Sequence, residues 1–121
     1  METVSFVTAE SGKDLIVAFA VMDPEEPTET DSLILLRTPM YEPFLEEWER
    51  GVKVSFERDD PDEEDFLEEV RWDEETAVLR LETLRHSYEL DLRKVDRKSL
   101  SAVCRVLRKM NYDRSIQLSG F

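Results

Sequence analysis

Apolar and polar residues alternate with a period of two in several short runs between residues 3 and 92. This period is typical of half-buried β-strands, because successive side chains of a strand point to opposite faces of the sheet. One run, Leu15–Met22, is almost wholly apolar and predicts a strand that is either buried on both faces or central in its sheet. Seven strands are predicted in all: Thr3–Thr8, Leu15–Met22, Leu33–Leu36, Val52–Phe56, Phe66–Trp72, Ala77–Glu82 and Tyr88–Leu92.

A different pattern predicts a short helix over residues 39–50. Pro43 suits a first helical turn, where its missing N–H has no partner to lose. Gly51 then stands where a glycine often follows the end of a helix. The apolar residues of this segment would share one face turned toward the core: Phe44, Leu45 and Trp48.

The second predicted helix runs from its N-cap, Asp96, to Met110, where the period changes from two to 3.6 and leaves one apolar stripe. Residues 112–121 form a tail with strand character through Ile116 and Leu118. The element order predicts a single α+β domain over residues 1–121. It would be an antiparallel β-meander sheet with one short inserted helix and a C-terminal amphipathic helix packed on one face.

Composition narrows the function classes. The 121 residues include one Cys and one His, so an internal disulfide and a Cys/His zinc site are excluded. The net charge of −13 argues against nucleic acid or an anionic membrane as partner. The N-terminus lacks a signal-peptide pattern, and a lone Cys104 fits a reducing compartment, so we expect a cytoplasmic protein.

The acidic residues are concentrated in one part of the chain. Residues 57–75 contain 12 carboxylates and only two basic residues, Arg58 and Arg71. A solvated loop and polar sheet face would account for such a run, and so would a docking surface for a basic protein. The docking hypothesis assigns partner binding to Asp59, Asp60, Asp62, Glu63, Glu64, Asp65, Phe66, Glu68 and Glu69.

Basic residues gather instead on the flank of the last helix that lies opposite its apolar stripe. They would bind an anionic ligand or a second protein, or they would complement the acidic residues between 57 and 75 of the same chain or of a dimer mate. The residues of this basic flank are Arg97, Lys98, Arg105, Arg108 and Lys109.

Familiar catalytic and cofactor motifs are missing. The acidic loop at about residues 57–66 offers oxygen ligands, but it does not match the calcium-binding loop, so no dedicated metal site is predicted. Cys104 lies on the apolar stripe and His86 in a turn, which disfavours a Cys–His pair. The three glycines are too far apart for a phosphate-binding loop, and no cofactor is expected.

These observations favour a non-enzymatic, acidic protein-binding module. In size, charge and layout alone it resembles small bacterial immunity proteins, which implies an inhibitor that neutralises a basic protein. An alternative is a secretion or assembly chaperone, including a homodimer, that binds a partner through apolar surface or a sheet edge. A third hypothesis is an enzyme with paired buried carboxylates, for which Glu89 and Asp91 are candidates although their alternation points them outward.

Overall fold

The computed structural model describes all 121 residues, and eight strands and one α-helix form its framework. The helix, α1, spans Arg97–Met110, and two 3₁₀ turns, η1 (Glu42–Phe44) and η2 (Glu47–Glu49), lie between the third and fourth strands. The strands are β1 (Glu2–Ser11), β2 (Leu15–Met22), β3 (Thr30–Arg37), β4 (Lys53–Phe56), β5 (Leu67–Asp73), β6 (Val78–Thr83), β7 (Ser87–Asp91) and β8 (Gln117–Ser119).

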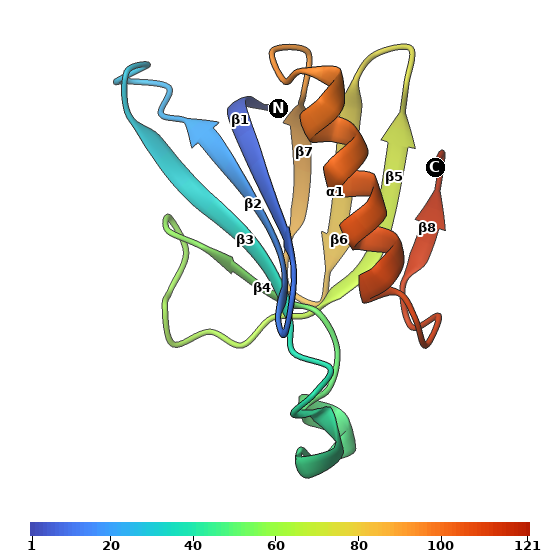
Figure 1. The fold of residues 1–121 in the computed structure, drawn as a ribbon. Helices are drawn as coiled ribbons and strands as arrows, with labels where there is room; N and C mark the ends of the chain where they lie inside the picture. The colour runs from blue at the N-terminus through green and yellow to red at the C-terminus, as the bar shows by residue number, and fades with distance from the viewer.

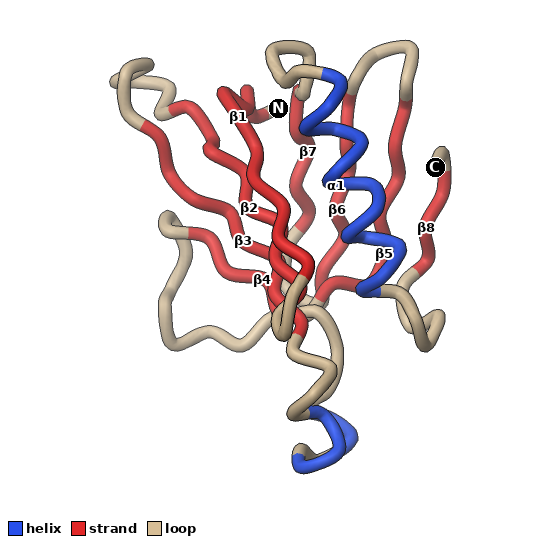
Figure 2. The backbone as a smooth tube through the Cα atoms, in the orientation of Figure 1, coloured by secondary structure: helices blue, strands red, loops and turns tan.

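All eight strands belong to one open sheet in the order β4-β3-β2-β1-β7-β6-β5-β8, and α1 lies across one of its faces (Figure 1). The predicted α+β class, with a C-terminal helix packed on one face, is therefore confirmed. Each of the seven predicted strands is present within a few residues of its expected bounds. Figure 2 shows α1 and the two 3₁₀ turns between β3 and β4 in blue, the strands in red, and the loops that join them in tan.

Two strand pairs depart from a purely antiparallel meander. β1 and β7 run parallel where two antiparallel units meet, and β5 and β8 run parallel at one edge. The parallel pairing of β5 and β8 follows from the crossover through α1, which returns the chain to the end of the sheet where β7 begins. β8 therefore runs parallel to β7, the strand before the helix. β7 is in turn parallel to β5, because β6 is antiparallel to both.

The core lies between α1 and the covered face of the sheet. Its 22 buried apolar residues come from both halves of the sheet and from the stripe on the helix. Asp96 caps α1 as predicted, because its carboxylate accepts a hydrogen bond from the backbone N–H of Ser99 at 2.8 Å. The residues that α1 buries are Val103, Val106, Leu107 and Met110.

A register shift in β1 changes which of its side chains are buried. Val4 and Val7 face the core, whereas Phe6 is 57% exposed. The predicted alternation, which put Val4 and Phe6 on one face, is wrong because a β-bulge lies between these two residues. A bulge adds one residue to one strand, so the faces exchange beyond it.

The segment between β3 and β4, residues 38–52, leaves the sheet as a lobe that projects from the rest of the molecule (Figure 1). The predicted helix over 39–50 is wrong: the two 3₁₀ turns are separated by extended backbone at Leu45 and Glu46. The inward placement of Phe44 and Trp48 is also wrong, since they are 86% and 68% exposed. A short helix gains most of its stability from tertiary packing, and the projecting lobe has no neighbour to supply it.

A buried arginine ties the lobe to the body of the molecule. Arg37, at the end of β3, donates two hydrogen bonds to the carboxylate of Glu42 at 2.7 and 2.9 Å. It donates two more to Asp113, at 3.0 and 2.8 Å, and one to the carbonyl of Met110 at 2.6 Å. The hydroxyl of Tyr112 also donates to Glu42 at 2.8 Å. One guanidinium thus joins β3, the lobe and the end of α1.

Candidate interaction surfaces

The acidic segment, residues 57–69, is held in place by one buried carboxylate. Asp65 is 5% exposed and accepts hydrogen bonds from the hydroxyl of Thr83 at 2.6 Å and the backbone N–H of Arg85 at 3.1 Å. The guanidinium of Arg85 in turn donates to the carbonyl of Glu64 at 2.7 Å. Asp65 therefore fixes the segment against the β6–β7 turn and is not free to contact a partner.

The nine predicted partner-binding residues fall into three structural groups. Asp65 is buried, and four others are half-buried: Asp59, Glu63, Phe66 and Glu69. Among these, Glu69 is paired with Arg71 at 2.9 Å. The four that present their side chains to solvent are Asp60, Asp62, Glu64 and Glu68. A docking role for the acidic segment thus rests on the last four carboxylates.

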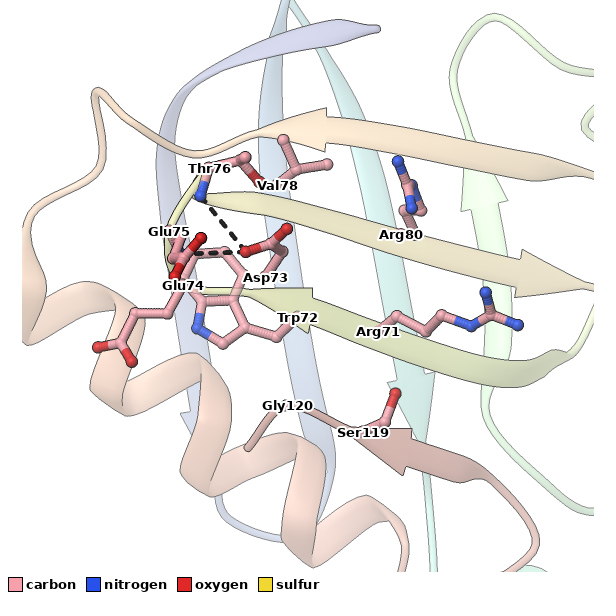
Figure 3. A pocket seen from close by; sticks show the side chains of 10 residues that line it. All are labelled: Arg71, Trp72, Asp73, Glu74, Glu75, Thr76, Val78, Arg80, Ser119 and Gly120. Carbon is pink, nitrogen blue, oxygen red and sulfur yellow. Dashed lines mark hydrogen bonds between the residues drawn. The ribbon is translucent and has the colours of Figure 1, made fainter.

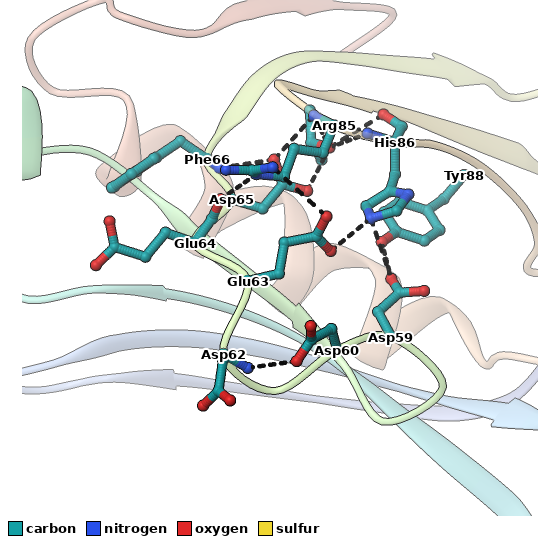
Figure 4. Close-up of polar contacts among 11 residues, drawn as sticks. Asp59, Asp60, Asp62, Glu63, Glu64, Asp65, Phe66, Arg85, His86 and Tyr88 are labelled. Carbon is teal, nitrogen blue, oxygen red and sulfur yellow. Dashed lines mark hydrogen bonds and ion pairs between the residues drawn. The ribbon is translucent and has the colours of Figure 1, made fainter.

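The single histidine meets the acidic segment from the β6–β7 turn (Figure 4). His86 Nε2 lies 2.8 Å from a carboxylate oxygen of Glu63 and 3.6 Å from one of Asp59. The hydrogen bond with Glu63 raises the pKa of His86 above its ordinary value. The hydroxyl of Tyr88 donates to Asp59 at 2.7 Å, and burial together with this bond raises the pKa of Tyr88. Sequence spacing gave no sign of this cluster, because its members come from two separate segments.

The lobe presents the most exposed group of large apolar side chains in the molecule. Met40 and Tyr41 are each 55% exposed and lie beside Phe44 and Trp48 in the sequence. Three exposed or half-exposed carboxylates of the same segment accompany them: Glu46, Glu47 and Glu49. Exposed aromatic residues framed by polar groups are typical of protein-interaction sites.

The sequence pattern did not predict the lobe, because the helix expected over 39–50 placed Phe44 and Trp48 in the core. A signal was present in the sequence, since two prolines and four glutamates leave this segment too few apolar residues for a continuous stripe.

The lobe also adjoins the acidic segment. Leu67 donates a backbone hydrogen bond to the carbonyl of Val52 at 2.9 Å, and Val54 donates one to the carbonyl of Asp65 at 3.0 Å.

The basic flank of α1 does not neutralise the acidic segment of its own chain. Of its five residues, only Lys109 makes a side-chain hydrogen bond, to the hydroxyl of Ser11 at 2.7 Å, and none forms an ion pair. Arg97, Arg105 and Arg108 instead border a shallow groove of about 760 Å³ whose apolar lining includes Leu100 and Cys104. Burial raises the pKa of the Cys104 thiol, which opposes formation of the nucleophilic thiolate.

A second hollow, of about 530 Å³, lies at the β5–β6 turn beside β8 (Figure 3). Its lining includes five charged residues, all exposed to solvent: Arg71, Asp73, Glu74, Glu75 and Arg80. Asp73 is used within the turn, because its carboxylate accepts from the backbone N–H groups of Glu75 and Thr76 at 3.0 and 3.4 Å. The hollow is therefore a polar surface depression with no converging reactive groups.

The carboxylate-enzyme hypothesis requires paired, buried acids whose pKa values are raised. Glu89 is exposed, and one of its carboxylate oxygens lies 3.4 Å from Nε of Arg80. Asp91 forms an ion pair in which a carboxylate oxygen lies 2.8 Å from a guanidinium nitrogen of Arg93. The hydrogen bonds from Arg93 lower the pKa of Asp91, and those from Arg37 lower the pKa of Glu42. These shifts are opposite to those that a general acid needs.

No helix has the length and apolar content needed to cross a membrane. Comparison of the chain with known protein families, with curated proteins and with solved structures found no match.

Proposed function

We propose that this protein is a non-enzymatic, acidic protein-binding module that acts as an inhibitor, of the immunity type, by covering a basic partner protein. The observation that carries the proposal is the projecting lobe, with Phe44 and Trp48 exposed among carboxylates. The partner has a cleft with an apolar pocket and a rim of Lys and Arg residues. The unpaired Cys104 supports a reducing, cytoplasmic setting for this interaction.

The two parts of the surface would contribute differently to binding. Aromatic residues that enter a pocket supply most of the binding free energy of an interface. Carboxylates at the rim accelerate association with a basic partner, and salt weakens their effect. We assign the first role to Phe44 and Trp48. The second belongs to the exposed carboxylates of the lobe and of the acidic segment.

The buried anchor supports the same proposal. Arg37 and Glu42 hold the lobe in one position relative to the sheet, so little conformational entropy is lost when a partner binds. Two aromatic residues on a projection that is anchored at Glu42 are suited to enter a cleft.

The experiment captures partners from a lysate of the source organism and then measures Kd for the captured protein at low and high salt. Phe44→Ser and Trp48→Ser should each weaken binding by about 30-fold, since hot-spot truncations cost about 2 kcal/mol or more. Replacing Asp60, Asp62, Glu64 and Glu68 by their amides should slow association and reduce the salt dependence. Phe6→Thr is the matched control, because Phe6 is an exposed aromatic residue outside the lobe.

The chaperone alternative predicts a different pattern. Its partner would not be basic, and affinity would depend on Phe44 and Trp48 but not on salt. Addition of a partner strand is less suited to this sheet, because its edges are β4 and β8, with four and three residues. A basic partner held equally well by all lobe variants would contradict the proposed role of the lobe.

A further inference from the structure

Three potential metal ligands converge where the acidic segment meets the β6–β7 turn. The ligand atoms are one carboxylate oxygen each of Asp59 and Glu63 and one ring nitrogen of His86. These three atoms lie within 4.8 Å of one another. Figure 4 shows the imidazole of His86 directed between the two carboxylates. Ligands around a tetrahedral zinc ion, at about 2.0–2.2 Å from the metal, lie roughly 3.4 Å apart, so small side-chain movements suffice to admit an ion.

The donor set has a defined chemical preference. One imidazole nitrogen with two carboxylate oxygens suits Zn²⁺ and related divalent transition metals, whereas Ca²⁺ and Mg²⁺ favour sites made of oxygen alone. Three protein ligands leave one position open, which is the arrangement of zinc sites that bind water or an external group. Each of the three side chains is about one-quarter to one-third exposed, so the site is accessible from one side.

The surroundings hold these ligands in place. The Tyr88 hydroxyl donates to Asp59, which is the kind of outer contact that orients a metal-binding carboxylate. The buried hydrogen bonds of Asp65 with Thr83 and Arg85 fix the acidic segment against the turn that carries His86. Both sides of the cluster are thus positioned by the fold and not by the cluster alone.

The local charge also favours a cation. Asp60, Asp62 and Glu64 lie in the same segment with their carboxylates in solvent. Arg85 is the one Lys or Arg that forms an ion pair with a member of the cluster, and its nearest nitrogen is 3.8 Å from Glu63. We propose that Asp59, Glu63 and His86 bind one divalent transition-metal ion, with Zn²⁺ as the reference ion and water in the remaining position.

The test is titration calorimetry of the EDTA-treated full chain with ZnCl₂. We expect one ion per chain. His86→Gln and Asp59→Asn should each weaken binding by more than about 100-fold, because loss of an outer contact alone costs about 10- to 100-fold. Tyr88→Phe, which removes only an outer contact, should fall in that smaller range. Asp60→Asn and Asp62→Asn remove the same charge from exposed positions of the same segment, and they should change affinity by less than about 3-fold.

Co²⁺ gives a spectroscopic check, since its visible absorption reports tetrahedral coordination and should disappear in His86→Gln. Circular dichroism establishes that each variant is folded, and Asp59→Asn serves in place of any His86 variant that is not. Equal Zn²⁺ affinity in wild type and His86→Gln would overturn the proposal, because it would show nonspecific binding by surface carboxylates. Wild-type affinity weaker than about 1 mM would overturn it as well.

Discussion

Arg37 is one of the largest fully buried side chains, and it occupies the same face of β3 as Leu33 and Leu35. Its guanidinium is satisfied by two carboxylates, those of Glu42 and Asp113, and by the carbonyl of Met110. A buried ion pair adds little net stability compared with apolar packing, but removal of one partner leaves the other charge buried and uncompensated. The contribution of Arg37 is therefore best seen as positioning the lobe.

We expect Arg37→Ala to lower the free energy of unfolding by about 3–5 kcal/mol, because Glu42 would remain buried without its partner. Urea denaturation measures this loss. Arg50→Ala is the control, since Arg50 is exposed and donates only to the carbonyl of Leu45. Its effect should stay within about 0.5 kcal/mol. A loss below about 1 kcal/mol for Arg37→Ala would contradict the importance of this network.

The same residues predict how stability depends on pH. Hydrogen bonds from Arg37 hold the pKa values of Glu42 and Asp113 below their ordinary values. A carboxylate whose pKa is lower in the folded state stabilises the protein above its unfolded pKa, and this stabilisation is lost as the pH falls. The free energy of unfolding should therefore decrease below about pH 4.5.

Urea denaturation at pH 7, 4 and 3 would follow this change. The matched comparison is Arg37→Ala, in which the two carboxylates lose the cation that lowers their pKa values. The fall in stability between pH 7 and pH 3 should be smaller in this variant than in wild type. Parallel pH profiles would show that other carboxylates cause the acid response.

At the scale of elements, the strands and the lobe differ in what fixes them. The strands pair over most of their length and bury one face. The lobe has only short 3₁₀ turns, and it is joined to the body mainly through Glu42 and the short pairing around Val52. Phe44 and Trp48 therefore contribute to a surface and not to the core.

We expect Phe44→Ser and Trp48→Ser to change the free energy of unfolding by less than about 0.5 kcal/mol each, as is usual for exposed positions. Leu33→Ala, by contrast, should cost about 2–5 kcal/mol because Leu33 is fully buried. Urea denaturation compares the three variants. A loss above about 2 kcal/mol for Trp48→Ser would show that the lobe packs against the body.

At the scale of the whole molecule, negative charge exceeds positive charge by 13. Some carboxylates are paired, as when Arg58 contacts Asp31 at 2.7 Å and Glu2 at 2.9 Å. Others are exposed and form no ion pair, including Asp60, Asp62 and Glu64. Repulsion among such charges opposes the folded state and is screened by salt.

Raising NaCl to about 0.5 M should therefore increase Tm by a few degrees, which corresponds to about 1 kcal/mol. Differential scanning calorimetry measures the shift. The variant in which Asp60, Asp62, Glu64 and Glu68 become amides should be more stable at low salt and respond less to NaCl. A Tm that decreases with salt would mean that the ion pairs outweigh the repulsion.

Sequence patterns located the strands and α1 well because their signals are local. Alternation along Leu79–Leu81 and Tyr88–Leu90 requires no knowledge of the partner strand. The Asp96 cap and the 3.6-residue period also depend on neighbouring residues alone. The β1 bulge could not be anticipated, because an inserted residue is defined only by the register against β2.

The amino-acid sequence alone determined the α+β class, the helix with its apolar stripe, the excess of negative charge and the scarcity of Cys and His. Tertiary structure decided which charged and aromatic residues are buried. It placed Arg37 and Asp65 inside, left Phe44 and Trp48 outside, and brought His86 to Glu63. The physical reason is that local periodicity specifies backbone conformation, whereas the environment of a side chain depends on contacts between residues distant in the chain.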